Sequence, residues 1–429
     1  MRKRLLIPFM VTVVVALVIS GCATPTAPAA PTTPTAPTTP TTPTTPTEPT
    51  TPAPSSQLKV KDIPEMQELI SLGIIDPELV INPYEGMSIK PDGTPYRFAW
   101  TPYLLAVDFA LNAGRYLESL LARSGAEVTL FDPGYDSQKQ VAFCEDVVSL
   151  GRADALIIAA VNEAAVGPIA DQAMDKGIRV YAYDIEIYSS VRKPVTWVNH
   201  DFDGPAGSNV VGEYYADLAA AGKQINLLEL WNNHAMETSI ERHNGFHAGL
   251  GDSPNIMVIE SADCMSSDEN AANIVMDEFT AHPELNAVYV QAAGSTGCVQ
   301  GLDQIGRLLP MNDPNHVIVA VNDMDTRIFQ GIDDENVDGA ASHGPVDMAG
   351  VLANLALTDL VLGQPVVSDV TIPMVFISHD NYKSLQLFGV PAAWPFLPTE
   401  QWDLWPAQDT TSIGIPIPTK AMRLELSGY

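Results

Sequence analysis

Short apolar segments alternate with longer amphipathic segments along most of the chain. The short segments have the length and composition of buried strands, and the longer ones repeat apolar residues at helical spacing. The pattern runs through residues 96–200 and then starts again. We expect strands at 96–100, 127–131, 155–159, 180–183, 195–198, 225–230, 256–260, 287–290, 317–321, 339–342 and 370–373. We expect helices at 63–72, 103–124, 137–150, 164–176, 207–221, 239–250, 268–282, 294–306, 326–330 and 347–362.

Strands that alternate with helices imply right-handed crossovers and a parallel sheet with helices on both faces. Because the pattern occurs twice, the predicted fold class is α/β, with two Rossmann-like lobes of one architecture. The predicted organisation along the chain is a signal peptide at 1–21, a linker at 22–57, an N-terminal extension at 58–95, two lobes within residues 96–380, and a C-terminal extension at 381–429.

The N-terminus has the features of a secretory leader. Arg2, Lys3 and Arg4 precede an apolar run at 5–19, which is shorter than the roughly 20 residues of a membrane-spanning helix. The residues Ile19-Ser20-Gly21-Cys22 resemble a bacterial lipoprotein box. That resemblance implies cleavage before Cys22 and a lipid on its sulfur. An ordinary signal peptide and a membrane anchor remain the alternatives.

Residues 23–57 consist almost entirely of Pro, Thr and Ala, a composition that cannot form a packed core. Such a stretch is typical of a stiff, extended linker. Together with the leader, it predicts an extracytoplasmic protein that is lipid-anchored to a bacterial cell membrane through Cys22.

Charge and cysteine content narrow the function further. The formal net charge is −30, which argues against nucleic acid or anionic lipid as a partner. Beyond Cys22 the chain has Cys144, Cys264 and Cys298, too few for a disulfide scaffold. Because the compartment is expected to be oxidising, we expect Cys264 and Cys298 to form a disulfide and Cys144 to stay a buried thiol.

Several segments in the two arrays resemble the type I periplasmic sugar-binding proteins, the ribose- and galactose-binding type. The resemblance extends from about residue 96 to residue 364 and depends on the order and spacing of the segments. They are Asp136-Ser137-Gln138-Lys139-Gln140, residues 152–159, residues 176–180, Val198-Asn199-His200-Asp201 with Gly207, Arg242-His243-Asn244-Gly245-Phe246, residues 282–288, Gln300-Gly301-Leu302 with Gly306-Arg307, and Gly344-Pro345 with Met348-Ala349-Gly350.

The resemblance implies the type I periplasmic-binding-protein fold, in which a hinge joins a first lobe, expected at 96–200 plus 344–365, to a second lobe, expected at 201–343 plus 366–380. It also implies a solute-binding protein that performs no chemistry. It would enclose a small polar ligand, expected to be a carbohydrate, by hinge closure, and deliver it to an ABC permease; we expect a monomer. A ligand-sensing receptor subunit for a membrane kinase or chemoreceptor is the main alternative. An extracellular carbohydrate hydrolase is a further alternative, because paired carboxylates leave no sequence signature.

Ligands of open parallel sheets bind beyond the carboxyl ends of the strands, so polar and aromatic residues that follow strands are the ligand candidates. In the first lobe the resemblance places ring-stacking aromatics at Trp100 and Tyr103, and a hydroxyl-binding aspartate at Asp184. The family often has arginine after that aspartate, where this chain has Ile185. The difference puts a simple pentose or hexose ligand in question.

The second lobe offers candidates of two origins. Trp231 and Asn233 follow a predicted strand, and Arg242 lies on the next predicted helix, within reach of the same edge. The resemblance adds three positions. Gln291 stands where the family has an asparagine, and either Asn322 or Asp323 stands where it has an aspartate that contacts ligand. His343 stands where the family has a glutamine at the hinge.

Metal, cofactor and enzyme signatures are weak in this sequence. His243 and His247 are four residues apart and would share one helix face, but they lack the intervening glutamate of an HExxH motif and a thiolate pair. The chain has no Gly-x-Ser-x-Gly elbow, and Gly294-Ser295-Thr296-Gly297 lacks the lysine of a phosphate-binding loop. We therefore expect no metal, no cofactor and no catalytic residue.

Overall fold

The computed structural model describes residues 58–71, 73, 75–106, 108–188, 196–200, 208–342, 344–382, 384–387, 390–391, 410–413, 415, 417–419 and 422–423. Cys22 and His343 lie outside the described residues, so the predictions made for them are not addressed by the structure. Within the described part, none of the helices combines the length and the apolar character needed to cross a membrane.

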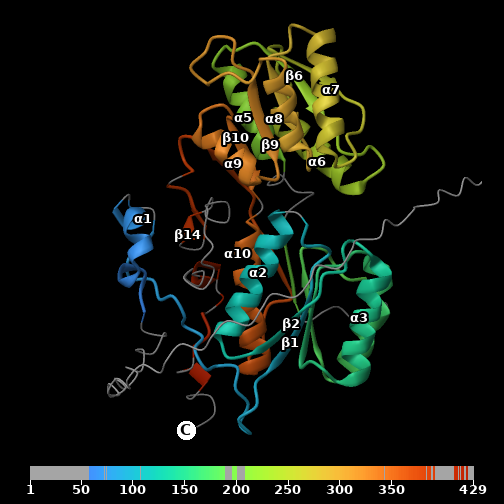
Figure 1. The fold of residues 1–429 in the computed structure, drawn as a ribbon, viewed down its shortest axis with the longest axis vertical. Helices are drawn as coiled ribbons and strands as arrows, with labels where there is room; N and C mark the ends of the chain where they lie inside the picture. The colour runs from blue at the N-terminus through green and yellow to red at the C-terminus, as the bar shows by residue number, and fades with distance from the viewer. Residues whose placement is uncertain are drawn as a thin grey trace, which may run out of the picture. The chain divides into compact units, whose positions relative to one another are not determined.

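The first lobe is built on one sheet whose strands all run parallel. Its order is β11-β5-β4-β3-β1-β2, and Figure 1 labels β1 and β2. The strands are β1 (Arg97–Thr101), β2 (Glu127–Leu130), β3 (Ala155–Ile158), β4 (Arg179–Tyr183), β5 (Thr196–His200) and β11 (Asp369–Ile372). The helices are α2 (Asp108–Arg123), α3 (Ser137–Leu150), α4 (Glu163–Asp175) and α10 (Pro345–Ala356).

Helices cover both faces of the first sheet. Figure 1 shows α2 and α10 on one side of it and α3 on the other. Side chains of α2 and α10 form one apolar core with alternate residues of the strands, and α3 and α4 form a second core with the remaining residues. The sequence sets the limits of α3: the Asp136 side chain accepts from the backbone N–H of Gln138 and Lys139, and Gly151 ends the helix in a left-handed conformation.

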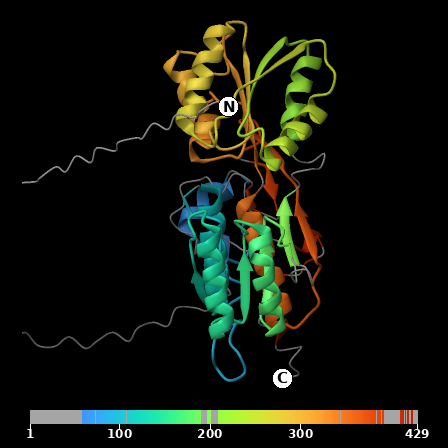
Figure 2. The same cartoon turned by 90° about the vertical axis from the view of Figure 1, so that its right-hand side faces the viewer.

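The second lobe repeats this arrangement. Its sheet has the order β12-β10-β9-β8-β6-β7, parallel except for β12. The strands are β6 (Ile225–Leu230), β7 (Ile256–Glu260), β8 (Ala287–Val290), β9 (Ile318–Asn322), β10 (Gly339–Ser342) and β12 (Val375–Ser378). The helices α5 (Asn209–Ala220) and α6 (Glu237–Leu250) cover one face; α7 (Asp268–Ala281), α8 (Ser295–Gln304) and α9 (Thr326–Asp333) cover the other (Figure 2).

The α/β fold class and its two similar lobes are confirmed, and almost every predicted strand and helix is present within a few residues. Numbered within each lobe, the first five strands of each sheet have the order 2-1-3-4-5, a doubly wound topology. Consequently β4 and β9 occupy equivalent places, as do β3 and β8, and β5 and β10. The predicted helix at 347–362 differs: α10 gives way to a π-helical turn at Leu357–Val361.

The sequence predicted that segment 366–380 belongs to the second lobe, but the structure divides this segment between the two lobes. Its first strand, β11, pairs with β5 in the first sheet, and its second, β12, pairs with β10 in the second sheet. Since only two residues separate Ile372 from Val375, the chain covers at most about 10 Å between the two strands. β11 ends at the carboxyl edge of the first sheet and β12 begins at that of the second, so these two edges lie close together.

Both extensions pack into the first lobe. Val60, Tyr84 and Met87 from the N-terminal side are buried in the core around α10, and Ile415 joins the same core from the C-terminal side. Asn354 of α10 joins the two extensions, because its Oδ1 accepts from the Tyr84 hydroxyl at 2.5 Å and its Nδ2 donates to Thr410 Oγ1 at 2.9 Å. The first lobe is therefore completed by residues from both ends of the described chain.

The predicted disulfide is wrong. Cys264 and Cys298 lie in the same apolar core of the second lobe, yet both are free thiols, as is Cys144 in the first lobe. Burial raises the pKa of the Cys144 and Cys298 thiols to about 12, so both stay protonated at neutral pH. These buried cysteines pack as small apolar side chains.

Candidate functional site

Two aspartates mark equivalent places at the carboxyl edges of the two sheets. Asp184 directly follows β4 with a φ of 64°, and Asp323 directly follows β9 with a φ of 63°. Left-handed backbone is uncommon outside glycine, although aspartate tolerates it better than most residues. Both lobes therefore place a carboxylate at a sharp turn at the end of the fourth strand.

In the first lobe, Asp184 is buried among aromatic and imidazole side chains. It is 4 % exposed, and the Nδ1 atom of His200, at the end of β5, lies 2.9 Å from its Oδ1. The indole N–H of Trp197 donates to the Asp184 main-chain carbonyl at 3.1 Å, which fixes the turn. The position of Asp184 is thus set from the neighbouring strand β5.

Tyr103 lies beside this aspartate. The Tyr103 pKa is raised well above its usual value, first by burial, then by the charge of Asp184, with smaller contributions from Tyr183 and Asp323 and from a hydrogen bond to Asp184. Carboxylates from both lobes therefore contribute to the raised pKa of Tyr103.

Trp100 occupies a different environment from Tyr103. Its side chain is fully buried in the first-lobe core, where its ring meets Tyr183 edge-on at 5.6 Å between centroids. Its indole N–H has no hydrogen-bond partner among the described residues. This is the environment of a packing residue beneath the site, because Trp100 is the fourth residue of the five-residue strand β1 and does not lie beyond its end.

In the second lobe, Arg242 of α6 reaches the sheet edge and holds Asp323. Its Nη1 donates to Asp323 Oδ2 at 2.8 Å and its Nη2 donates to Oδ1 at 3.1 Å, a bidentate pair. Nη1 also donates to the main-chain carbonyl of Gln291 at 2.9 Å. Arg242 is thus one of the predicted site residues that the structure brings together with another, and it links the turns after β8 and β9.

Gln291 follows β8 and is fully buried. Its Nε2 donates to Glu229 Oε1 at 2.7 Å, and its Oε1 accepts from the Asn232 main-chain N–H at 3.3 Å. Asn322, the last residue of β9, donates from Nδ2 to Ser208 Oγ at 2.6 Å, while its buried Oδ1 has no partner among the described residues. An unpaired buried amide oxygen at a sheet edge is available to a ligand hydroxyl.

Trp231 and Asn233, the ligand candidates after β6, make packing and turn contacts within their own loop. Trp231 is 4 % exposed and stacks on His234, with 3.9 Å between ring centroids. Asn233 accepts from the main-chain N–H of Ala235 at 2.9 Å, which is a turn contact. Trp231 and Asn233 therefore shape the loop that follows β6.

Several edge residues were not predicted as site residues. His200 and Ser208 contact predicted residues, and Tyr135 and Tyr188 are exposed aromatics on first-lobe loops after β2 and β4, with exposures of 58 % and 61 %. Their positions after strands are the signal that could have found Tyr135 and Tyr188. The pairing of His200 with Asp184 depends on β4 and β5 being neighbours, which local sequence does not show.

Glu229, His243 and His247 form a cluster that could hold a metal ion, since their ligand atoms all lie within 4.8 Å of one another. Glu229 is the penultimate residue of β6, and the two histidines lie one turn apart on α6. The carboxylate of this cluster thus comes from the strand beneath the two histidines, which local sequence does not show.

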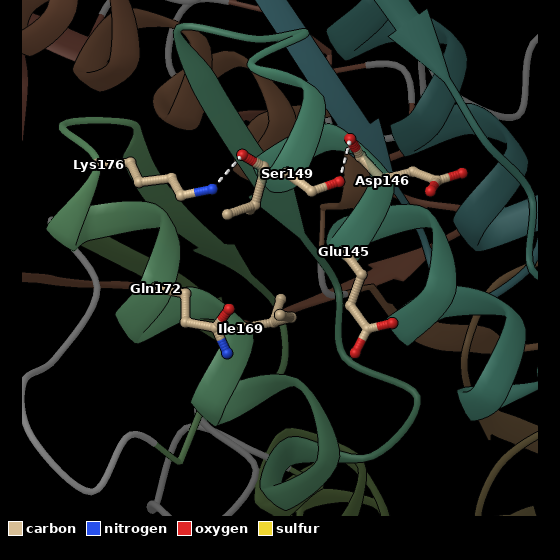
Figure 3. A pocket seen from close by; sticks show the side chains of 7 residues that line it. Glu145, Asp146, Ser149, Ile169, Gln172 and Lys176 are labelled. Atoms are coloured by element: carbon tan, nitrogen blue, oxygen red, sulfur yellow. Dashed lines mark hydrogen bonds between the residues drawn. The ribbon is translucent and has the colours of Figure 1, made fainter.

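A separate cavity of about 370 Å³ lies between α3 and α4 (Figure 3). Lys176 at the end of α4 donates to the Val148 carbonyl at 3.0 Å. Glu145 and Gln172 line the cavity, as Figure 3 shows. In βα units the helices run antiparallel to the strands, so the C-terminal ends of α3 and α4, which line the cavity, lie at the amino edge of the sheet. This cavity is therefore remote from Asp184.

Comparisons with known proteins agree with the doubly wound lobes. A curated relative, the D-ribose/D-allose-binding protein of Pseudomonas aeruginosa, is 26 % identical over 208 residues, which are 44 % of this chain and 63 % of the relative. The chain thus matches less than two thirds of the length of that relative.

Solved structures show the same fold. An ABC transporter solute-binding protein from Mycobacterium smegmatis with bound glycerol is 21 % identical, covering 67 % of this chain and 95 % of the other, with a TM-score of 0.55. An ABC transporter periplasmic solute-binding protein from Actinobacillus succinogenes with bound D-allose is 16 % identical, covering 66 % and 98 %, with a TM-score of 0.58.

Residues 98–365, more than half of the chain, match a family described as the periplasmic binding protein domain. The matched range begins at β1 and ends just beyond the π-helical turn, so it includes both turns that carry the left-handed aspartates. The chain therefore belongs to the periplasmic binding protein domain family.

Proposed function

We propose that this protein is an extracytoplasmic, lipid-anchored solute-binding protein that captures a small neutral polyol, a sugar, and delivers it to an ABC permease. Capture is closure of the two lobes on the ligand, which removes it from water. No bond is made or broken. A lipid on Cys22 and a linker over residues 23–57 would tether the lobes to the membrane.

One observation is the main support for this proposal: Asp184 and Asp323 occupy equivalent places at the ends of β4 and β9, and Tyr103 lies beside Asp184. Carboxylates held at neighbouring sheet edges accept hydrogen bonds from hydroxyl groups that point in different directions. The Asn322 Oδ1 atom adds a third acceptor. An array of acceptors favours a ligand rich in hydroxyl donors.

The charge of the site argues against an anionic ligand. Of the edge residues described above, only Arg242 has a permanent positive charge, and Asp323 already pairs with it in bidentate fashion. The chain as a whole has a formal net charge of −30, which also repels anions. Exposed Tyr135 and Tyr188 offer ring faces of the kind that pack against the C–H surface of a sugar ring.

The sugars and the polyol that the relatives are named for or bind give the first compounds to test. D-ribose, D-allose and glycerol should be tested by thermal shift and calorimetry on the purified full-length protein, beside an anionic control such as gluconate. We expect at least one neutral polyol to raise the melting temperature and to bind with one-to-one stoichiometry. A preference for the anion, or no binding across a broad panel of sugars, would contradict the proposal.

Transport and sensing are separated by the phenotype of a deletion strain. Loss of the gene should abolish uptake of the radiolabelled ligand, and a copy with Asp184→Ala should not restore it. If uptake is unchanged while a transcriptional or chemotactic response to the ligand disappears, the protein is a sensory subunit and delivery to a permease is refuted.

A further inference from the structure

Three side chains of the second lobe converge at one point above β6. Nδ1 of His243 lies 3.0 Å from Glu229 Oε1 and 3.2 Å from Oε2, and Nε2 of His247 lies 2.9 Å from Glu229 Oε2. Histidines four residues apart on a helix project from the same face, here onto the strand that the helix covers. Both imidazoles thus direct a ring nitrogen at one carboxylate.

We propose that Glu229, His243 and His247 form a binding site for a divalent transition metal ion, with Zn²⁺ as the best match. Two imidazole nitrogens and a carboxylate oxygen are a ligand set that zinc accepts. In a tetrahedral site with bonds of about 2.0–2.1 Å, neighbouring ligand atoms lie roughly 3.3 Å apart. The observed nitrogen–oxygen separations of 2.9–3.2 Å are close to that value.

The surroundings hold the ligands in position. Gln291 Nε2 donates to Glu229 Oε1 at 2.7 Å, an outer-shell contact of the kind that orients metal-binding carboxylates. The Trp231 ring lies 4.8 Å from the His243 ring, and the Phe246 ring meets the His247 ring edge-on at 5.4 Å. Each ligand is therefore fixed by a neighbour from its own lobe.

The site is closed on one side and open on the other. The Glu229 side chain is fully buried, while those of His243 and His247 are 25 % and 37 % exposed. An ion could enter past the imidazoles without unfolding the lobe. Three protein ligands leave the fourth position of a tetrahedral ion to water or to a group from outside the chain.

The competing explanation for this cluster, a proton-only explanation, is that the histidines bind protons and no metal ion. Burial raises the pKa of Glu229, but the two histidines outweigh this effect and the net pKa is lowered, while the hydrogen bond that His243 donates to Glu229 raises the pKa of His243. His243 also faces Glu260, which pairs with Glu229 across β6 and β7. Protonated imidazoles could thus merely neutralise the buried carboxylate, and only a binding experiment distinguishes the two.

The test measures metal binding by the full-length protein purified without a polyhistidine tag and freed of metal by a chelator. Zn²⁺ titration by calorimetry should give one site per chain, and Co²⁺ should give the visible absorption of a tetrahedral complex. Because each variant loses a direct ligand, Glu229→Gln and His247→Gln should each weaken Zn²⁺ binding at least roughly tenfold.

His282→Gln is the matched control, because His282 in the same lobe also lies beside two glutamates, 3.8 Å from Glu278 and 3.4 Å from Glu284, but in an exposed setting. Its zinc affinity should equal that of the unmodified protein. Melting curves recorded in chelator confirm that each variant is folded. Added Zn²⁺ should raise the melting temperature of the unmodified protein and of His282→Gln, which keep the three ligands, but not that of Glu229→Gln or His247→Gln. Absence of stoichiometric Zn²⁺ and Co²⁺ binding, or equal loss in His282→Gln, overturns the proposal and leaves the proton-only explanation. Sugar binding is measured separately, so failure here does not affect the proposed function.

Discussion

At the scale of single residues, Asp184 combines burial, a strained turn and contact with Tyr103, so its removal should affect ligand binding more than folding. We expect Asp184→Ala to weaken binding of the identified ligand by about 1.5–3 kcal/mol, because hydroxyl donors would be buried without an acceptor. Tyr103→Ala should cost a similar amount through lost packing against the ligand. Calorimetry measures both.

Asp146→Ala is the control for these variants, since Asp146 lines the remote cavity between α3 and α4. It should bind the ligand like the unmodified protein. Unchanged affinity in both Asp184→Ala and Tyr103→Ala, or collapse of the unliganded fold, would mean that the two residues are structural.

Asp347, in the first turn of α10, gives a prediction about pH. Burial raises its pKa well above the usual range, and its Oδ1 atom has no partner among the described residues. Since the folded-state pKa lies above the unfolded one, the folded protein binds the extra proton. The free energy of unfolding therefore falls as pH rises from about 4, the unfolded value, towards the folded pKa.

The variant Asp347→Asn, neutral at every pH, should escape this loss. Its melting temperature should match that of the unmodified protein near pH 4 and exceed it at pH 7.5. A melting temperature lower than that of the unmodified protein at pH 7.5 would show that the carboxylate is charged and paired in the folded state.

At the scale of elements, α5 and α6 pack so closely that glycine is required at their contact. A Cβ atom on Gly249 would lie 2.1 Å from the Asn209 carbonyl oxygen, and one on Gly212 would lie 2.1 Å from the Phe246 carbonyl oxygen. We expect Gly249→Ala to lower the free energy of unfolding by about 3 kcal/mol, because backbone must move to admit a methyl group. Denaturant titration measures the change.

Gly245→Ala provides the comparison on the same helix. A Cβ atom there would lie 3.4 Å from the nearest atom, an ordinary contact, so the alanine should be tolerated or slightly stabilising. Equal destabilisation by both alanines would mean that α6 as a whole, and not its close approach to α5, is sensitive to substitution.

Asn354 is the element-level link between α10 and the two extensions. Asn354→Leu should lower the free energy of unfolding by about 2 kcal/mol, because the buried Tyr84 hydroxyl loses its acceptor. Tyr84→Phe removes the same bond from the other side and should cost about 1 kcal/mol. In the double variant the two losses should be less than additive; full additivity would contradict the link.

The sequence alone predicts most of the helices and strands, because the residues that define each one lie within it or directly beside it. Strands such as β3 are uninterrupted apolar runs, and α3 has both a capping aspartate and a terminating glycine. The split of 366–380 between the sheets was missed, because an edge strand can pair with either sheet without changing its own pattern. The π-helical turn after α10 was missed for a similar reason, since its apolar residues continue the helical period.

The candidate site is predicted less completely than the fold. The family resemblance, together with position at or just after the end of a strand, identified Asp184, Gln291, Asn322 and Asp323, which all lie at the sheet edges. The same rule placed Trp100 at the edge, although it is a core residue, because one residue along a strand moves a side chain to the opposite face. Partners such as His200 and Glu229 were missed because their contacts cross between elements.

At the scale of the whole molecule, the anchor is testable independently of the lobes. We expect the protein made in a bacterial host to incorporate radiolabelled palmitate and to partition into detergent, because a lipid on Cys22 adds apolar surface. Cys22→Ala should abolish both, whereas Cys298→Ser should retain them. Labelling that survives Cys22→Ala would refute the lipoprotein assignment.

The two lobes differ in when their parts emerge during synthesis. The second lobe is almost contiguous, from α5 to β10, and lacks only β12. The first lobe has its opening strands near residue 100, yet its core also needs α10 and Ile415. The ribosome must therefore make nearly the whole chain before the first lobe can close. For a chain exported through a membrane channel, this order would leave the first lobe without part of its core until residue 415 has been made.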